Sequence, residues 1–308
     1  FAWVLRKFMN ISGSEGLVAA GNIFMGMTES PVLIKNYLPT MNRSEIFLVM
    51  VSGMGTIAGS VMGTYIGMLG GTDPAAKVLF ATHLLSASVM AVPGSIVLAK
   101  MLCPQTEEAT DHVAISGKEK ENSNILDAIS SGTVTGVKLM TNIAAMLLVF
   151  ISLVALANYI TEGVIGRYTG LNDWIVKITD GKAQGLTFQF ILGVITSPFM
   201  WLIGVPSQDI MLVGSLLGQK TILNEFVAYF QLQQWKDAGL FMYEKSILMS
   251  TYILCGFANI SSIGILLGGL GVLAPEKRGL ISRIGVPAMI GGALVSVLSA
   301  TIIGMILG

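Results

Sequence analysis

Long stretches without a charged residue set the pattern of this chain. Each of them exceeds the roughly 20 residues that a transmembrane helix needs. Because the interior of a bilayer offers backbone groups no hydrogen-bond partner, such stretches cross it as helices. The pattern therefore predicts an all-α polytopic membrane protein embedded in a lipid bilayer. The uncharged stretches are residues 46–72, 78–99, 139–161, 183–208, 246–275 and 284–308.

Two short apolar segments flank a polar segment at residues 22–31. The apolar arm on either side has about 10–13 residues, which as helix reaches roughly 15–20 Å, half of a bilayer core about 30 Å thick. Gly26 permits a turn, and Pro31 lacks the N–H that a continuing helix would use. We expect a re-entrant hairpin over residues 11–38 with Glu29 at its tip. An ionisable residue at that depth is costly unless it faces a wet cavity or a ligand.

A helix interrupted by glycines follows this hairpin. We expect it over residues 46–69, with an unbroken helix over 77–100 behind it. The interruption contains Gly53, Gly55, Gly59 and Gly63. A Gly-rich interruption in a spanning helix marks an unwound turn with free carbonyl groups.

The same order of elements recurs near the C-terminus. A hairpin over residues 207–235 carries Glu225 at its tip, and a broken helix over 246–270 and an unbroken helix over 283–307 follow it. The expected fold is therefore two inverted repeats, each a re-entrant helical hairpin followed by a broken transmembrane helix and an unbroken one. The repeats cover residues 1–102 and 183–308.

The segment between the repeats, residues 103–182, has another character. It begins with a polar loop over 103–124 and continues with a scaffold helix over 139–161. An interfacial helix with Trp174 follows, since Trp prefers the headgroup level of a membrane. The next apolar stretch, residues 186–205, is expected to break at Pro198.

Composition supports the membrane class and excludes several others. The chain has 308 residues, of which 53% are hydrophobic and only 12% charged, with mean hydropathy +0.74. Soluble domains carry about 25% charged residues. A net charge of zero gives no support for a nucleic-acid partner, and two cysteines form neither a disulfide framework nor a zinc pattern. No phosphate-binding loop, dinucleotide fingerprint or metalloprotease motif is present. We therefore expect neither an enzyme nor a bound cofactor.

Glu29 and Glu225 occupy corresponding places in the two repeats. Carboxylates accept hydrogen bonds and suit a polyhydroxylated substrate such as a sugar ring, although a Glu at a helix end near the interface is the plainer alternative. Interrupted segments at matching positions of two halves indicate the binding site of a secondary transporter. The repeat therefore predicts a secondary active transporter.

Other polar residues lie at the two helix breaks. Asn259 and Ser262 either line a cavity or bond to neighbouring helices, and Thr56 has the same two interpretations. The Asn22 amide oxygen, with carbonyl groups near Met25 and Ile57, suits a hard cation, although Asn22 is equally explained as a helix cap.

Taken together, these motifs resemble the concentrative nucleoside transporter family along essentially the whole chain. The segments that carry the resemblance are residues 21–31, 56–61, 204–206, 224–229, 256–264 and 294–300. The resemblance implies a sodium/nucleoside symporter in the plasma membrane. We expect this to be the inner membrane of a bacterium. The resemblance also implies a homotrimer in which a mobile transport domain moves against a scaffold in an elevator-like motion. Family members carry further helices before the first hairpin, so the sequence resembles a chain without its N-terminal helices.

The resemblance also assigns roles to individual residues. It places Thr28 and Glu29 against the nucleobase, with Val61 as an apolar contact. It makes Glu225, Asn259 and Ser262 ligands of the ribose, with Phe257 nearby. It implies a sodium shell from the Asn22 side chain, the Met25 carbonyl, Thr56 and the Ile57 carbonyl.

One position departs from the family pattern. Among the substrate-binding positions that the resemblance implies, the family usually has Gln between Gly26 and Thr28, whereas this chain has Met27, which lacks an amide to pair with a base edge. The preference between purine and pyrimidine nucleosides therefore stays open. Proton-coupled relatives tend to lose the Asn at the position of Asn22, so its presence favours Na⁺ as the coupling ion. A proton-coupled symporter and a non-transporting membrane receptor on the same scaffold are the alternatives.

Overall fold

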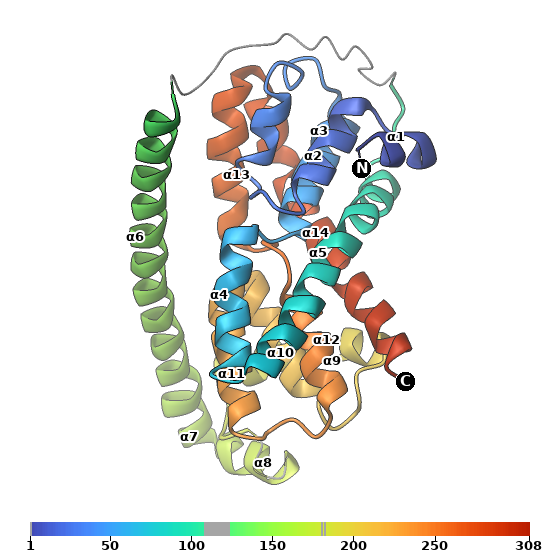
Figure 1. Ribbon diagram of the computed structural model, residues 1–308. Coiled ribbons are helices and arrows are strands. Elements are labelled where there is room, and N and C mark those ends of the chain that lie inside the picture. The colour runs from blue at the N-terminus through green and yellow to red at the C-terminus, as the bar shows by residue number, and fades with distance from the viewer. Residues whose placement is uncertain (1, 108–123, 180, 182) are drawn as a thin grey trace. The chain divides into compact units, whose positions relative to one another are not determined.

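The structure, a computed structural model, describes residues 2–107, 124–179, 181 and 183–308, and these residues form helices without a β-strand (Figure 1). The all-helical fold expected from the sequence is confirmed. The chain divides into two compact units, Phe1–Asp111 with Gln189–Gly308, and His112–Phe188. Each unit is described separately.

The N-terminal part of the first unit begins with short helices and continues with long ones. Capping boxes start α2 and α3: Ser12 accepts from the Glu15 N–H and Asn42 from the Glu45 N–H, while each Glu side chain bonds back to the cap residue. The returning arm of the hairpin is only a 3₁₀ helix, η1, with Pro31 near its start. The elements are α1 (Ala2–Met9), α2 (Gly13–Gly21), η1 (Ser30–Ile34), α3 (Arg43–Gly55), α4 (Gly59–Gly70) and α5 (Pro74–Leu102).

The C-terminal part of the same unit contains a second hairpin and a second interrupted helix. Asn224 begins α11 by accepting a hydrogen bond from the Val227 N–H, and Asn259 begins α13 by accepting one from the Ser262 N–H. The elements are α9 (Phe188–Leu202), α10 (Ile210–Ile222), α11 (Glu225–Asp237), α12 (Glu244–Leu254), α13 (Ile260–Leu273), η3 (Pro275–Lys277) and α14 (Arg278–Ile306).

The two interrupted helices run in opposite directions and meet at their breaks. In Figure 1, α3 lies above α4, whereas α13 lies above α12. The Phe257 N–H of one break donates to the Thr56 carbonyl of the other at 3.2 Å. Gly256, with φ of +155°, makes this approach possible, because a Cβ there would lie 3.0 Å from the Met54 carbonyl oxygen.

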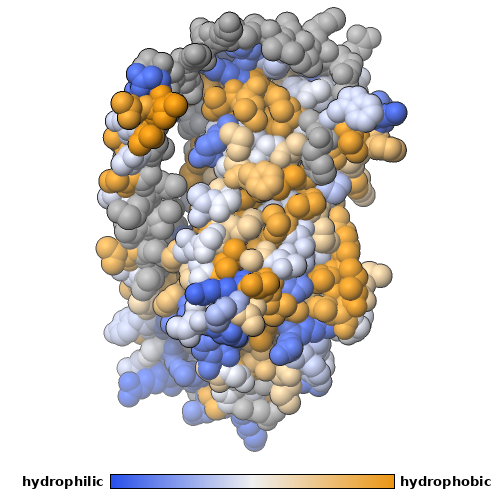
Figure 2. All heavy atoms as spheres, viewed as in Figure 1, coloured by the Kyte–Doolittle hydropathy of each residue, from blue (hydrophilic) through white to orange (hydrophobic). Residues whose placement is uncertain are grey.

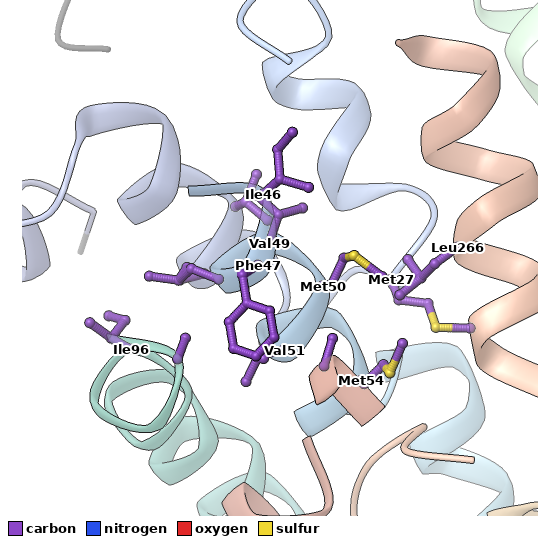
Figure 3. Close-up of a cluster of buried hydrophobic side chains, with 14 of the residues drawn as sticks. Met27, Ile46, Phe47, Val49, Met50, Val51, Met54, Ile96 and Leu266 are labelled. Atoms are coloured by element: carbon purple, nitrogen blue, oxygen red, sulfur yellow. The ribbon is translucent and has the colours of Figure 1, made fainter. Parts of the chain in front are cut away.

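Apolar side chains fill the unit in two clusters. The first gathers around α3 and includes Met27, Met50 and Leu266 (Figure 3). The second gathers around α4, α12 and the second hairpin and includes Tyr65 and Tyr229. Phe257 packs against both clusters, so the breaks lie between them.

The outer faces of α5 and α14 are apolar although they are exposed. On α14 the exposed side chains recur every fourth residue, which places them on one face of the helix. Figure 2 shows such hydrophobic residues at the surface in the middle of the view. Among the described residues, three helical stretches are long and apolar enough to cross a membrane, namely Arg43–Gly70, Pro74–Leu102 and Pro275–Ile306. This agrees with an integral membrane protein.

The second unit contains α6 (Ile125–Asn158), the π-helix η2 (Tyr159–Gly166), α7 (Arg167–Thr169) and α8 (Leu171–Ile178). Helix α6 is longer than the scaffold helix expected at 139–161, because Asn124 starts it by accepting a hydrogen bond from the Asp127 N–H at 2.9 Å. Trp174 lies on α8 with an exposed side chain. Most of the predicted polar loop, residues 108–123, lies outside the described part of the chain.

Candidate functional site

A buried carboxylate marks the second break. Glu225, the first residue of α11, is only 8% exposed. The Tyr65 hydroxyl donates to its Oε1 at 3.2 Å, and the Asn259 amide Nδ2 donates to its Oε2 at 2.9 Å. Both oxygens are thereby directed by groups from α4 and from the start of α13. The carboxylate is held in one orientation at the point where three helices begin or pass.

Asn259 ties this carboxylate to the backbone of the break. Its side-chain oxygen accepts hydrogen bonds from the Ser262 N–H at 2.9 Å, the Ser262 hydroxyl at 3.0 Å and the Ser261 hydroxyl at 2.6 Å. The amide therefore uses its oxygen as an N-cap and its nitrogen as a donor to Glu225. The structure thus joins Glu225, Asn259 and Ser262 in one network. We call this set, with Tyr65, the Glu225 cluster.

The Glu225 cluster is suited to bind neighbouring hydroxyl groups. A carboxylate accepts two hydrogen bonds through its two oxygens, and the amide and hydroxyls beside it both donate and accept. Such bonds to an ionised acceptor are shorter and stronger than neutral ones. Each Glu225 oxygen accepts one of these two side-chain hydrogen bonds and keeps a second acceptor position, so a polyhydroxylated ligand can bond to a preformed acceptor pair beside the Tyr65 and Asn259 donors.

A second polar group lies where the first hairpin meets the first break. Asn22 is fully buried at the end of α2, and its Nδ2 donates to the Ser52 hydroxyl at 3.0 Å. Its Oδ1 is buried without a hydrogen-bond partner among the described residues. An unpaired buried acceptor is costly, so it calls for a donor or a cation. Thr56, also buried, donates its hydroxyl to the Ser52 carbonyl at 2.9 Å.

The hairpin tip is attached to the first break through the backbone. The Gly59 N–H donates to the Phe24 carbonyl at 3.0 Å. A Cβ at Gly59 would lie 3.1 Å from that carbonyl oxygen, so any side chain there would push the tip away. Met25 and Ile57 belong to the two segments that this bond joins, and Ile57 is fully buried. The predicted sodium ligands therefore come from adjoining segments.

The residues predicted to contact a nucleobase lie outside the Glu225 cluster. Met27 is buried in the first apolar cluster, and Figure 3 shows it beside Met50 and Leu266. The Thr28 methyl group lies against Gly269, 3.4 Å from where a Cβ would be. That position is seven residues, or about 10 Å, beyond Ser262 along α13. Thr28 therefore contacts the same helix as the Glu225 cluster, farther along it.

Glu29 is exposed, and its carboxylate folds back over Gly26. No hydrogen bond among the described residues joins it to the Glu225 cluster. Val61, in the first turn of α4, is half-buried against the second apolar cluster. The two acids are thus in different surroundings, one buried and hydrogen-bonded and the other open.

Two residues of this region were not predicted from the sequence. Tyr65 donates to Glu225 and stacks on Tyr229, with ring centroids 4.1 Å apart and an angle of 22° between the planes. Lys220, on α10, is fully buried, and its ammonium donates to the Ile253 carbonyl at 2.8 Å. A signal for Lys220 was available, because it is a lone basic residue in an otherwise uncharged helix.

Comparison with known proteins places this chain in a family. Residues 83–304 match the family described as Na+ dependent nucleoside transporter C-terminus, and residues 1–72 match one described as nucleoside recognition. An uncharacterized transporter of Haemophilus influenzae is 39% identical over 99% of this chain and 68% of its own length. Sodium/nucleoside cotransporter 1 of Rattus norvegicus is also 39% identical over 99% of this chain, but this covers 46% of its length.

Solved structures agree with these sequence matches. The transporter CNTnw in an inward-facing substrate-bound state is similar with a TM-score of 0.82 and 35% identity, over 100% of this chain and 68% of that one. A variant of CNTnw in an outward-facing state gives a TM-score of 0.85 with 35% identity, over 99% and 68%. Relatives and structures thus agree over the whole sequence, and the chain belongs to the concentrative nucleoside transporter family.

Proposed function

We propose that this protein takes up nucleosides by symport with Na⁺ through an alternating-access mechanism. The observation that carries the proposal is the buried Glu225 cluster at the second break, in a chain whose relatives include proteins named sodium/nucleoside cotransporters. CNTnw has been solved in inward-facing and outward-facing states, which supports alternating access for the family.

We assign the ribose to the Glu225 cluster. Glu225 accepts hydrogen bonds from two ribose hydroxyls, while Asn259 and Ser262 complete the polar surroundings and Phe257 offers an apolar edge. This assignment is supported by the network that already orients the carboxylate, so little reorganisation is needed when the ligand binds.

The nucleobase lies, in this proposal, between the first hairpin and the first turn of α4. Thr28 and Glu29 offer polar contacts and Val61 an apolar one. Met27 contributes through packing, because its side chain fills the core beneath the tip. The exposed carboxylate of Glu29 is free to turn toward a base as the hairpin moves.

We assign the sodium ion to the junction of the first hairpin and the first break. The Asn22 Oδ1, the Thr56 hydroxyl and the carbonyls of Met25 and Ile57 are neutral oxygen donors, the type that a hard cation prefers. Support comes from the unpaired buried Oδ1 of Asn22, which a cation would satisfy. Bound Na⁺ would hold the hairpin tip against the break and so couple ion occupancy to the shape of the substrate site.

The larger mechanism follows the family resemblance. We propose two inverted repeats, a homotrimeric assembly in the plasma membrane, and an elevator-like movement of the hairpins and broken helices against a scaffold. The opposite directions of the two broken helices in Figure 1 support the inverted repeat.

Uptake of labelled uridine and adenosine into proteoliposomes tests the proposal. We expect accumulation driven by an inward Na⁺ gradient and its loss when choline replaces Na⁺ at fixed pH. Glu225→Gln should remove uptake while assembly remains intact, because the amide retains the size of the side chain but loses one acceptor and the charge. Gln234→Glu, at an exposed position of α11, is a matched control that adds a carboxylate away from the site.

Wild-type uptake by Glu225→Gln would refute the ribose assignment. Uptake that ignores Na⁺ but follows a pH gradient would instead identify the proton as the coupling ion.

A further inference from the structure

Lys220 is a fully buried cation that the proposed transport mechanism does not use. Its ammonium donates to the Ile253 carbonyl at 2.8 Å and to the Ser296 hydroxyl at 2.9 Å. These hydrogen-bond partners are neutral oxygens from α12 and α14. A buried charge is expensive unless its surroundings compensate it, so the position of this lysine requires an explanation.

The compensation comes from the end of a broken helix. The last carbonyls of α12 lack partners within the helix, and the C-terminal end of a helix carries partial negative charge. Side chains satisfy them one by one: Tyr229 donates to Thr251 at 2.8 Å, Lys220 to Ile253, and Ser296 to Cys255 at 3.1 Å. The ammonium is therefore placed where a free cation would bind.

In the first half of the unit a hairpin helix also ends beside the first part of a broken helix, but there the hairpin helix carries no lysine. Helix α2 begins the first hairpin as α10 begins the second, and its last turn contains no basic residue. Asn22, at the end of α2, reaches Ser52 near the end of α3, just as Lys220 reaches Ile253 near the end of α12. At Asn22, however, an acceptor oxygen is left unpaired, whereas Lys220 supplies donors.

We propose that the Lys220 ammonium is a permanent internal cation that takes, at the second break, the place that free Na⁺ takes at the first. The inference rests on the proposed function, because it treats the Asn22 site as the sodium site. Lys220 is a positioning residue: its ammonium fixes the end of α12 through the Ile253 carbonyl and ties it to α14 through the Ser296 hydroxyl. The second break then needs no ion from solution.

Two substitutions of Lys220, which differ in the size of the side chain, distinguish this role of the charge from simple packing. Lys220→Ala removes the ammonium and leaves space lined by the Ile253 carbonyl and the Ser296 hydroxyl, which a sodium ion can enter. Lys220→Met fills that space with an apolar chain of similar length and offers no room for an ion. If Lys220 served only to fill volume, Met would be the better replacement.

The experiment measures the thermal unfolding midpoint of the purified full chain in NaCl and in choline chloride, without nucleoside. In wild type we expect a saturable stabilisation by Na⁺ that Asn22→Ala removes. In the Asn22→Ala background, Lys220→Ala should restore a saturable Na⁺ response and Lys220→Met should not. Gln219→Leu is the matched control, since Gln219 is a buried neighbour on α10 whose side-chain amide donates to the Ser215 hydroxyl one turn earlier, and it should keep the wild-type response.

In NaCl the order of stability decides the question. The proposal expects Lys220→Ala to be more stable than Lys220→Met, and a steeper Na⁺ dependence of nucleoside uptake in Lys220→Ala than in wild type. The reverse order of stability would overturn it, and so would failure of both variants to fold in NaCl, because Na⁺ must be able to replace the ammonium. A wild-type chain without any Na⁺ response would count against the sodium function, while the ranking of the two Lys220 variants would still test the internal charge.

Discussion

The hydroxyl of Tyr65 offers a test of how a single group positions the proposed ribose ligand. Tyr65→Phe removes the donor to Glu225 and leaves the ring that stacks on Tyr229. A hydrogen bond to a charged group contributes about 1.5–3 kcal/mol, so we expect the Km for nucleoside uptake to rise roughly tenfold or more. Radioactive uptake at varied nucleoside concentration measures this change.

Tyr229→Phe is the matched control for that variant. It removes the same atom from the other ring of the stack, but the Tyr229 hydroxyl donates to the Thr251 carbonyl at 2.8 Å and not to Glu225. We expect a lower unfolding midpoint with an unchanged Km. Equal values of Km for both variants would show that the Tyr65 hydroxyl does not position the carboxylate.

At the scale of residues, the sequence predicted which polar residues belong to the site better than it predicted the side chains that contact them. Glu225, Asn259 and Ser262 each stood out as polar residues inside apolar stretches, which are costly and therefore informative, and the family resemblance grouped them as ribose ligands. Tyr65 was missed because a tyrosine in a spanning helix is usually packing, and only the fold brings it to a residue 160 positions away. Met27 was predicted beside the substrate, but no sequence pattern reveals that its side chain is directed into the core.

At the scale of elements, Gly256 is the position on which the meeting of the two breaks depends. Its φ of +155° is unfavourable for a residue with a Cβ, and that atom would lie 3.0 Å from the carbonyl oxygens of both Met54 and Gly55. These are backbone atoms at the end of α3, so they cannot move cheaply. We expect Gly256→Ala to lower the free energy of unfolding by about 1–3 kcal/mol from backbone strain, with the contacts adding to this. The unfolding midpoint of the detergent-solubilised protein measures the loss.

Gly268→Ala on α13 serves as the control for Gly256→Ala. Gly268 is exposed within the helix, and a Cβ there would meet nothing within 4 Å. Because Ala favours helix by about 1 kcal/mol over Gly, this variant should be as stable as wild type or more so. If both variants behaved alike, the close approach at Gly256 would be unimportant.

Glycine patterns located the interruptions of the long helices, but proline was misleading. The prediction of a break at Pro198 was wrong, because α9 continues from Phe188 to Leu202 with Pro198 inside it. Pro198 deprives the Val194 carbonyl of its usual N–H partner, and the Ser197 hydroxyl donates to that carbonyl at 2.9 Å instead. Hydroxyl side chains near a proline can thus preserve a helix in apolar surroundings. The sequence pattern also could not predict that the returning arm of the first hairpin is short, since apolar residues alone do not distinguish η1 from a longer α-helix.

At the scale of the whole molecule, the long uncharged stretches, supported by the composition, were sufficient to predict a helical membrane protein. The structure adds where the apolar surface lies. On α14 the exposed side chains Val286, Ile290, Leu294, Leu298 and Ile302 form one stripe along the helix. The opposite face carries small buried residues that pack against the rest of the unit, among them Gly292, where a Cβ would lie 2.7 Å from the Met54 Cβ. The exposed stripe therefore faces lipid or an apolar partner, because water would not favour it.

A charge introduced into the middle of that stripe tests this orientation. Ile290 is 50% exposed and lies well inside α14, so Ile290→Lys places an ammonium in the apolar layer without disturbing the core. We expect a cost of about 2.5–3.5 kcal/mol and a marked loss of protein from the membrane fraction. Met305→Lys changes an exposed residue in the last turn of α14, where the long side chain can reach the interface, and should be tolerated. Immunoblots of washed membranes measure the yield of each variant. Equal yields would mean that this face of α14 contacts water and that the inferred orientation of the helix is wrong.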